Sequence, residues 1–231
     1  MSQSPHEAPR RSWRRFVLRL VHLNVGLMAF GFSIALMLAA GVGLGPWDVF
    51  HQGAAQHLPI TIGQVMVAAG LALLLVSMLL AGVRPGLGTV LNMALIGPWV
   101  DLFLAQPFLP RGEGWLDGGA IFATGLVMNG LATGLYITAG LGAGPRDGFA
   151  LALAQRLNTR VRRARTGVEA CVLLTGWLLG GTVGLGTLAF ALAIGPLMQW
   201  GLRIMSGFER RYGLAGTPGV PAAPPVHDAG S

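Results

Sequence analysis

The sequence has no lysine, a single cysteine and few charged residues. Charged residues make up 11% of its 231 residues and hydrophobic residues 53%. Because soluble globular domains carry about a quarter charged residues, this composition excludes an ordinary soluble domain and favours a chain surrounded by lipid. The one cysteine, Cys171, lies in an apolar run, which excludes an internal disulfide and a cysteine-rich metal site.

Common catalytic and nucleotide-binding motifs are also missing. The chain has no His-Glu-x-x-His motif, no Gly-x-Ser-x-Gly motif and no Walker A loop. We therefore expect a protein that is not an enzyme and that binds no metal or cofactor. Any energy coupling would then use an ion gradient or a partner.

Long stretches without acidic or basic residues dominate what is present. About 20 apolar residues cross a bilayer as a helix, and these stretches show no alternation typical of a β-barrel. The first stretch is also too long for a cleaved signal peptide. We predict an all-α, polytopic bundle of six transmembrane helices, near residues 18–42, 62–82, 86–106, 118–141, 164–182 and 185–206.

The arginines predict the orientation of this bundle. With six crossings and the N-terminus inside, 15 of the 16 arginines fall on the cytoplasmic side and only Arg111 falls outside. Positive residues prefer the cytoplasmic side, so both termini are predicted to be cytoplasmic. The net charge of +7 is then a sign of topology, and we expect the lipid bilayer as a partner and no nucleic acid.

An internal repeat divides the chain into two membrane units. Between Ala40 and Leu58, ten of 19 residues recur 99 positions later, and from Leu80 to Pro98 nine residues recur 98 positions later. Three crossings per copy is an odd number, so the copies are predicted to have opposite orientations in the membrane. The predicted segments are a disordered cytoplasmic tail (1–12), a first repeat (13–108), a periplasmic loop (109–117), a second repeat (118–207) and a second disordered cytoplasmic tail (208–231).

The same Gly-x-Gly-Pro-x-Asp-x-Phe motif stands in both copies, at residues 43–50 and 142–149. A glycine, a proline and an aspartate two residues later are typical of a helix start, so Gly45 and Gly144 each precede a short amphipathic helix, at 46–57 and 145–157. Asp48 is expected near the outer face and Asp147 near the inner face. The two aspartates either cap these helices or direct their polar ends toward a shared pathway.

Three further residues are candidates for that pathway. Pro98 and Pro196 fall at equivalent places in the third and sixth crossings, where a proline frees a backbone carbonyl, although membrane helices also use proline for packing alone. Glu169 is a carboxylate in the apolar part of the fifth crossing. It either pairs with Arg165 four residues earlier or closes a capping box with Thr166.

These motifs resemble a known group of bacterial proteins. The Gly-x-Gly-Pro-x-Asp-x-Phe motif, the run from Arg165 to Thr187 and Ile194-Gly195-Pro196 are similar to the YczE/YyaS/YitT family of integral membrane proteins, the YczE branch in particular. The similarity covers about residues 15–206. It implies a multi-pass protein of the bacterial cytoplasmic (inner) membrane, and it supplies no catalytic or binding residues to transfer.

Two functions fit this sequence. The first is passage of a small solute or ion across the membrane, with Asp48, Asp147 and the starts of the short helices along the pathway. The alternative is a non-transporting accessory or scaffold protein that supports a partner assembly. Partners would then be the unknown solute or ion, another membrane protein or a second copy of this chain.

Overall fold

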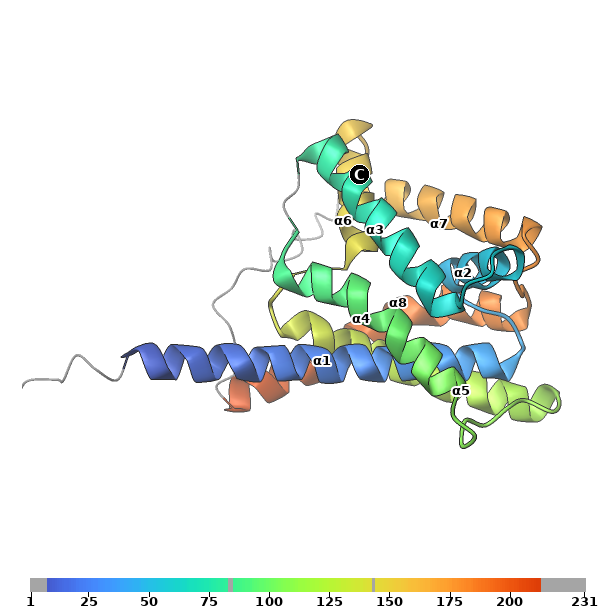
Figure 1. The fold of residues 1–231 in the computed structure, drawn as a ribbon, viewed down its shortest axis with the longest axis horizontal. Helices are drawn as coiled ribbons and strands as arrows, with labels where there is room; N and C mark the ends of the chain where they lie inside the picture. Colours follow the sequence, from blue (N-terminus) through green and yellow to red (C-terminus); the bar gives the residue numbers. More distant parts are fainter. Residues whose placement is uncertain (1–7, 83–84, 143, 213–231) are drawn as a thin grey trace, which may run out of the picture.

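The structure is a computed structural model that describes residues 8–82, 85–142 and 144–212. Within these residues the chain forms eight helices and no strand (Figure 1). In chain order the helices are α1 (Ala8–Ala40), α2 (Pro46–His57), α3 (Ile62–Ala81), α4 (Leu87–Leu104), α5 (Trp115–Thr138), α6 (Pro145–Arg156), α7 (Val161–Leu178) and α8 (Leu185–Tyr212).

Five helices are long and apolar enough to cross a membrane. The qualifying segments are Phe16–Ala40 of α1, α3, α4, α5 and Leu185–Gly207 of α8. The fifth predicted crossing, at 164–182, is helical as α7, but it does not qualify, because four charged residues lie in its first half. The two predicted short helices are present as α2 and α6.

The predicted tails overlap the ends of the outermost helices. α1 begins at Ala8 and α8 ends at Tyr212, so helix extends several residues into each predicted tail. The remainder of the tails, residues 1–7 and 213–231, lies outside the described residues, and so does Arg84.

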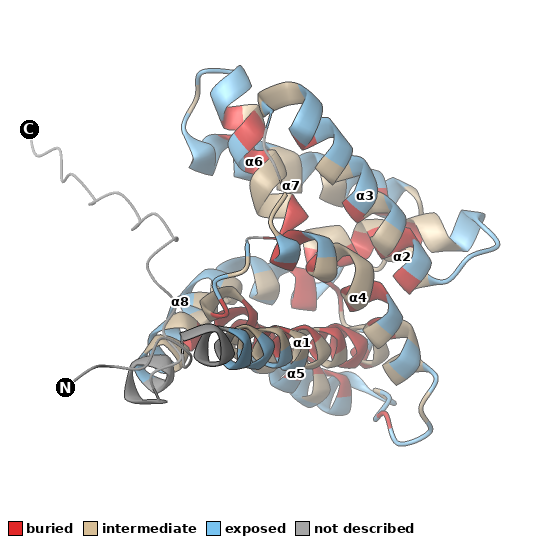
Figure 2. Cartoon of the chain, turned by 60° about the vertical axis from the view of Figure 1, so that its left-hand side comes forward, coloured by how far each residue is buried: buried red, intermediate tan, exposed pale blue. Residues whose placement is uncertain are grey.

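The helices form two layers joined by α4 (Figure 2). In the first layer α5 packs between α1 and α8. These helices approach closely because glycines face the contacts: a Cβ at Gly26 would lie 2.7 Å from the backbone nitrogen of Tyr136, and one at Gly134 would lie 2.4 Å from the carbonyl carbon of Gly201. α1 supplies much of the buried core, including Leu23, Leu27, Ile34 and Met37.

The second layer contains the short helices. α2 packs against α7 and α6 packs against α3, so each short helix contacts a long helix from the other sequence copy (Figure 1). The short helices lie outside the α1–α5–α8 layer, with their first residues directed toward it. The site described below forms between the layers.

Equivalent hydrogen bonds join each sequence copy to the loop of the other copy. The Gly88 N–H donates to the carbonyl of Leu141 at 2.8 Å, and the Gly186 N–H donates to the carbonyl of Val42 at 2.8 Å. Val42 and Leu141 are 99 positions apart, and Gly88 and Gly186 are 98 apart, so these are corresponding residues with exchanged partners.

Matching backbone angles accompany these exchanged contacts. Gly43 has a φ of 120° and its counterpart Gly142 has a φ of 134°. Only glycine adopts this region without strain. A Cβ at Gly43 would also lie 2.8 Å from the backbone nitrogens of Gly184 and Thr187. The glycines of the motif are therefore required where the loops of the two copies meet.

Candidate functional site

The two short helices begin without a side-chain cap. Gly45 and Gly144 are the N-cap residues of α2 and α6, with nearly identical extended backbone angles, and each is followed by a proline. Glycine has no side chain to bond the N–H groups of the first turn, and proline has no N–H. In α2 the Asp48 N–H donates to the Gly45 carbonyl at 2.9 Å, so the Trp47 N–H and the positive end of the helix dipole remain available. α3 differs, because Thr61 closes a capping box with Gln64 and Asp101 accepts a hydrogen bond from the Gly63 N–H at 2.9 Å.

Both helix starts line one cavity of about 180 Å³. It has room for several water molecules or a small solute. Asn129, Thr133 and Tyr136 of α5 line one wall, and α7 and α8 line another. Of the seven residues predicted for the pathway, the cavity brings together five: Gly45, Asp48, Gly144, Asp147 and Glu169.

Asp48 and Asp147 thus lie closer together than the predicted outer and inner positions suggested. The reason is local: Gly41 and Gly43 in one loop, and Gly140 and Gly142 in the other, have positive φ angles that turn the chain back after α1 and α5. The helix starts therefore return to the middle of the molecule.

The cavity lies near the midpoint of the spanning segments. Phe30, which lines it, is 14 residues after Phe16 and ten before Ala40 in the apolar part of α1. Asn129 is 14 residues after Trp115 and nine before Thr138 in α5. At 1.5 Å per residue, each is about 21 Å from the start of its segment and about 15 Å from its end, and the second distance is about half the thickness of a bilayer core.

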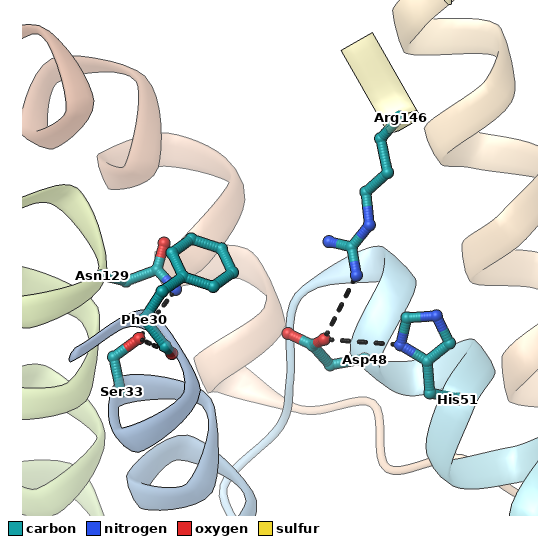
Figure 3. A network of polar contacts seen from close by, with 6 residues as sticks. All are labelled: Phe30, Ser33, Asp48, His51, Asn129 and Arg146. Carbon is teal, nitrogen blue, oxygen red and sulfur yellow. Dashed lines mark hydrogen bonds and ion pairs between the residues drawn. The ribbon is translucent and has the colours of Figure 1, made fainter. Parts of the chain in front are cut away.

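Asp48 is a buried carboxylate held between two basic side chains (Figure 3). Its side chain is only 6% exposed, and its Oδ1 lies 3.6 Å from His51 Nδ1 and 4.0 Å from Arg146 Nη2. Among the described residues, neither Oδ1 of Asp48 nor Nδ1 of His51 has a hydrogen-bond partner. A buried charge without close partners is costly, so this carboxylate depends on the nearby cation.

Arg146 is the cation that faces Asp48 from the other sequence copy. Its guanidinium carbon lies 5.1 Å from the centre of the Trp47 ring, a cation–π geometry. Trp47 and Arg146 occupy the same variable position of the two motifs, between proline and aspartate. They are 99 positions apart, so corresponding positions of the two copies contact each other directly.

The second aspartate has a more exposed ion pair. Asp147 Oδ1 lies 3.2 Å from Arg165 Nη1, and Arg165 Nε donates to Glu169 Oε1 at 3.0 Å. Thr166 lies inside α7 and not at its N-cap, so the pair with Arg165, and not a capping box, accounts for Glu169. Asp147 and Glu169 are each more than one third exposed.

The opposite wall has a polar contact between α1 and α5. The Asn129 amide donates to Ser33 Oγ at 3.0 Å, and Ser33 donates to the Phe30 carbonyl at 2.7 Å (Figure 3). Thr133 lines the cavity one helical turn from Asn129 and is buried. Hydrogen-bonding groups therefore line the cavity on the side that faces Asp48.

The prolines lie outside this cavity. Pro98 and Pro196 are inside α4 and α8, and neither lines the 180 Å³ cavity. Sequence reasoning missed Arg146, His51 and Tyr136. The sequence did contain a signal for Arg146. The aspartate of the motif is the same in both copies, and the residue before it is arginine in the second copy and tryptophan in the first. Among the described residues no group of three His, Cys, Asp or Glu side chains could hold a metal ion.

Comparisons with known proteins identify relatives of this chain. Residues 17–203 match a family described as a family of unknown function, DUF6198. The uncharacterized membrane protein YczE of Bacillus subtilis is 33% identical over 216 residues, covering 93% of this chain and 99% of the relative. An uncharacterized protein of Haemophilus influenzae is 35% identical over 216 residues, covering 89% and 96% of the two chains.

A more distant relative is the uncharacterized protein YyaS of Bacillus subtilis, 24% identical over 186 residues, covering 79% of this chain and 91% of the relative. No solved structure matches the chain. The resemblance to YczE and YyaS is thus confirmed. With most of its length matched by the family and its long apolar helices, the chain is a membrane protein that belongs to the DUF6198 family.

Proposed function

We propose that this protein passes a small solute or ion across the bacterial cytoplasmic membrane through the cavity between the starts of α2 and α6. The observation that carries the proposal is Asp48, a carboxylate 6% exposed with a buried oxygen that has no hydrogen-bond partner among the described residues, lining a cavity at mid-span. Ionisable groups at membrane depth are costly, and they commonly mark substrate or ion pathways.

The helix starts support the same proposal. Two uncapped helix N-termini, two guanidinium groups and three carboxylates line a cavity whose other walls include aromatic and aliphatic side chains. Broken or short helices that end near the midplane provide this kind of polar site in many transporters. A mainly structural cavity would need no such concentration of charge.

The proposed topology has six crossings and two inverted halves. α7 is the fifth crossing in chain order and completes the six, with its arginine-rich start at the cytoplasmic surface and its apolar second half in lipid. The start of α1 and the end of α8 lie at the same end of the molecule, which supports an even number of crossings (Figure 1). The exchanged hydrogen bonds of Gly88 and Gly186 support the relation between the halves.

The test is a flux measurement with the purified protein in liposomes. The probes are isotope-labelled amino acids, carboxylic acids, amines and inorganic ions, each supplied with and without a proton or sodium gradient. We expect at least one probe to enter faster than into protein-free liposomes. Asp48→Asn should reduce that rate at least tenfold, because the cavity loses its buried charge.

The matched control is Asp117→Asn, which changes an aspartate at the start of α5 that does not line the cavity. This variant should transport at the original rate. Flux of no probe, with Asp48→Asn lowering only the yield of protein, would instead favour the accessory or scaffold role.

A further inference from the structure

A second, smaller cavity of about 30 Å³ lies beside the first. Trp47 and Arg146 line both cavities. The large cavity has α5, α7 and α8 as its other walls, whereas the small one has α3 and α4. The Trp47–Arg146 contact therefore separates two cavities that lie against different helices.

The walls formed by α7 and α3 are counterparts. Residues lining the large cavity from α7 correspond, at a spacing of 99, to residues lining the small cavity from α3. The same spacing relates the first residues of the two helices, Ile62 and Val161. The matched pairs are Arg165 and Met66, Val168 and Ala69, and Glu169 and Gly70.

The walls formed by α8 and α4 match in the same way. At the spacing of 98 found for this part of the repeat, three lining residues of α8 correspond to three lining residues of α4. The pairs are Phe190 and Asn92, Ala191 and Met93, and Ile194 and Ile96. The small cavity is thus the counterpart, in the other sequence copy, of the large one.

The two cavities are directed toward opposite ends of the molecule. Each borders the first half of its long helix, α3 or α7. α7 ends beside α2, where the Thr182 N–H donates to Gln52 Oε1 at 2.7 Å, and α2 leads directly into α3. α7 therefore ends near the point where α3 begins, so the starts of α3 and α7 lie at opposite ends (Figure 1).

The cavities differ in size and in charge. The large cavity has Arg165 and Glu169 where the small cavity has Met66 and Gly70, and its volume is about 180 Å³ against about 30 Å³. Two corresponding cavities, one large and one small, are what an inverted repeat produces when it exposes its site to one side at a time.

We propose that the two cavities are the two halves of one route and that the contact between Arg146 and Trp47 is the gate between them. This proposal rests on the proposed function. The guanidinium lies over the Trp47 ring and within 4.0 Å of Asp48, so both partners hold it across the route. In the state described the larger cavity borders the start of α7, and movement of Arg146 away from Trp47 joins the cavities.

The gate is tested by thiol accessibility. In a Cys171→Ser background, Val168→Cys reports on the large cavity and Ala69→Cys on its counterpart. Vesicles of known orientation are treated with a membrane-impermeant methanethiosulfonate reagent. From the cytoplasmic side, we expect position 168 to react at least tenfold faster than position 69.

Removing the gate should change only one of these rates. Arg146→Ala and, independently, Trp47→Ala should raise the reaction of position 69 from the cytoplasmic side at least tenfold and leave position 168 unchanged. Arg146→Lys and Trp47→Phe keep a cation and a ring, so position 69 should remain protected. The unchanged rate at position 168 also shows that each variant is folded.

Two results would overturn the proposal in distinguishable ways. If position 168 reacts but position 69 stays protected in both alanine variants, the contact is not the gate, while the proposed function stands. If position 168 does not react from either side in any variant, the large cavity does not reach water, and the proposed function fails together with the gate.

Discussion

Asp48 and Asp147 occupy the same position in the two sequence copies but lie in different environments. The Asp48 side chain is 6% exposed and its cation, Arg146, comes from the other copy. The Asp147 side chain is 36% exposed and pairs with Arg165, which belongs to its own copy. The shared motif sets where the carboxylates lie, whereas the surrounding helices decide how strongly each one depends on its partner.

This difference teaches that the duplicated halves have specialised. The loops and helix starts are nearly the same in both copies, because the chain path requires the same glycines and prolines. The charged partners Arg146, Arg165 and Glu169 occur only in the second copy, where the first has Trp47, Met66 and Gly70. The second copy thus supplies the charged partners, and the first copy supplies Asp48, the buried carboxylate that Arg146 faces.

The largest loss of stability is expected at a motif glycine that is the same in both copies. Gly43→Ala and Gly142→Ala should each lower the free energy of unfolding by about 3 kcal/mol, because both positions have positive φ and a Cβ would meet the opposite loop. The measurement is unfolding by SDS titration in mixed micelles. Gly148→Ala, in α6 with open space around it, is the control and should be neutral or stabilising. Tolerance of alanine at position 43 would contradict the close loop contact.

An equally large effect should distinguish the two carboxylates. Arg146→Ala leaves Asp48 buried without a cation and should cost about 3 kcal/mol, whereas Arg165→Ala should cost under about 1 kcal/mol, because Asp147 and Glu169 reach water. The same titration compares the two. Adding Asp48→Asn should recover most of the loss in Arg146→Ala. Equal costs for both arginines would remove the distinction between the copies.

How much of this arrangement can be predicted depends on the range of the interaction. The bounds of α2 and α6 follow from local signals, Gly45-Pro46 and Gly144-Pro145, and the predicted helices agree with them to within one residue. The pair of Arg165 with Glu169 is likewise local, at a spacing of four.

Local sequence signals do not predict the contacts between the two copies. Asp48 and Arg146 are 98 residues apart, and their contact depends on how the halves dock and on the return of both loops toward mid-span. The same holds for the cavity itself. α7 is difficult for a related reason: its arginines satisfy the positive-inside rule but also remove it from the helices that qualify as membrane spans.

A smaller effect should come from the hydrogen bond between the copies at Thr187. Its buried hydroxyl accepts from the Leu44 N–H at 3.1 Å, so Thr187→Val leaves that N–H unpaired and should cost about 2 kcal/mol. Thr175→Val is the control. Its exposed hydroxyl bonds only within α7, to the Cys171 carbonyl, and its loss should be near zero by the same titration. Equal losses would mean that the loops do not depend on each other.

The smallest effect is expected at Glu169, in the exposed cluster of Asp147, Arg165 and Glu169. Glu169→Gln removes one half-exposed charge, and Arg165 keeps Asp147 as its partner, so the free energy of unfolding should change by at most about 0.5 kcal/mol. A loss above about 2 kcal/mol would show that this cluster is as dependent on its charges as Asp48.

The inverted relation of the halves is tested most directly at two corresponding exposed residues. Leu58 follows α2 and Leu157 follows α6; they are 99 positions apart and 50% and 61% exposed. In the Cys171→Ser background, Leu58→Cys and Leu157→Cys are treated in intact spheroplasts with a membrane-impermeant thiol reagent. Position 58 should react at once and position 157 only after the membrane is permeabilised. Reaction of both positions in intact spheroplasts would place both halves in the same orientation and contradict a site built from opposed helix starts.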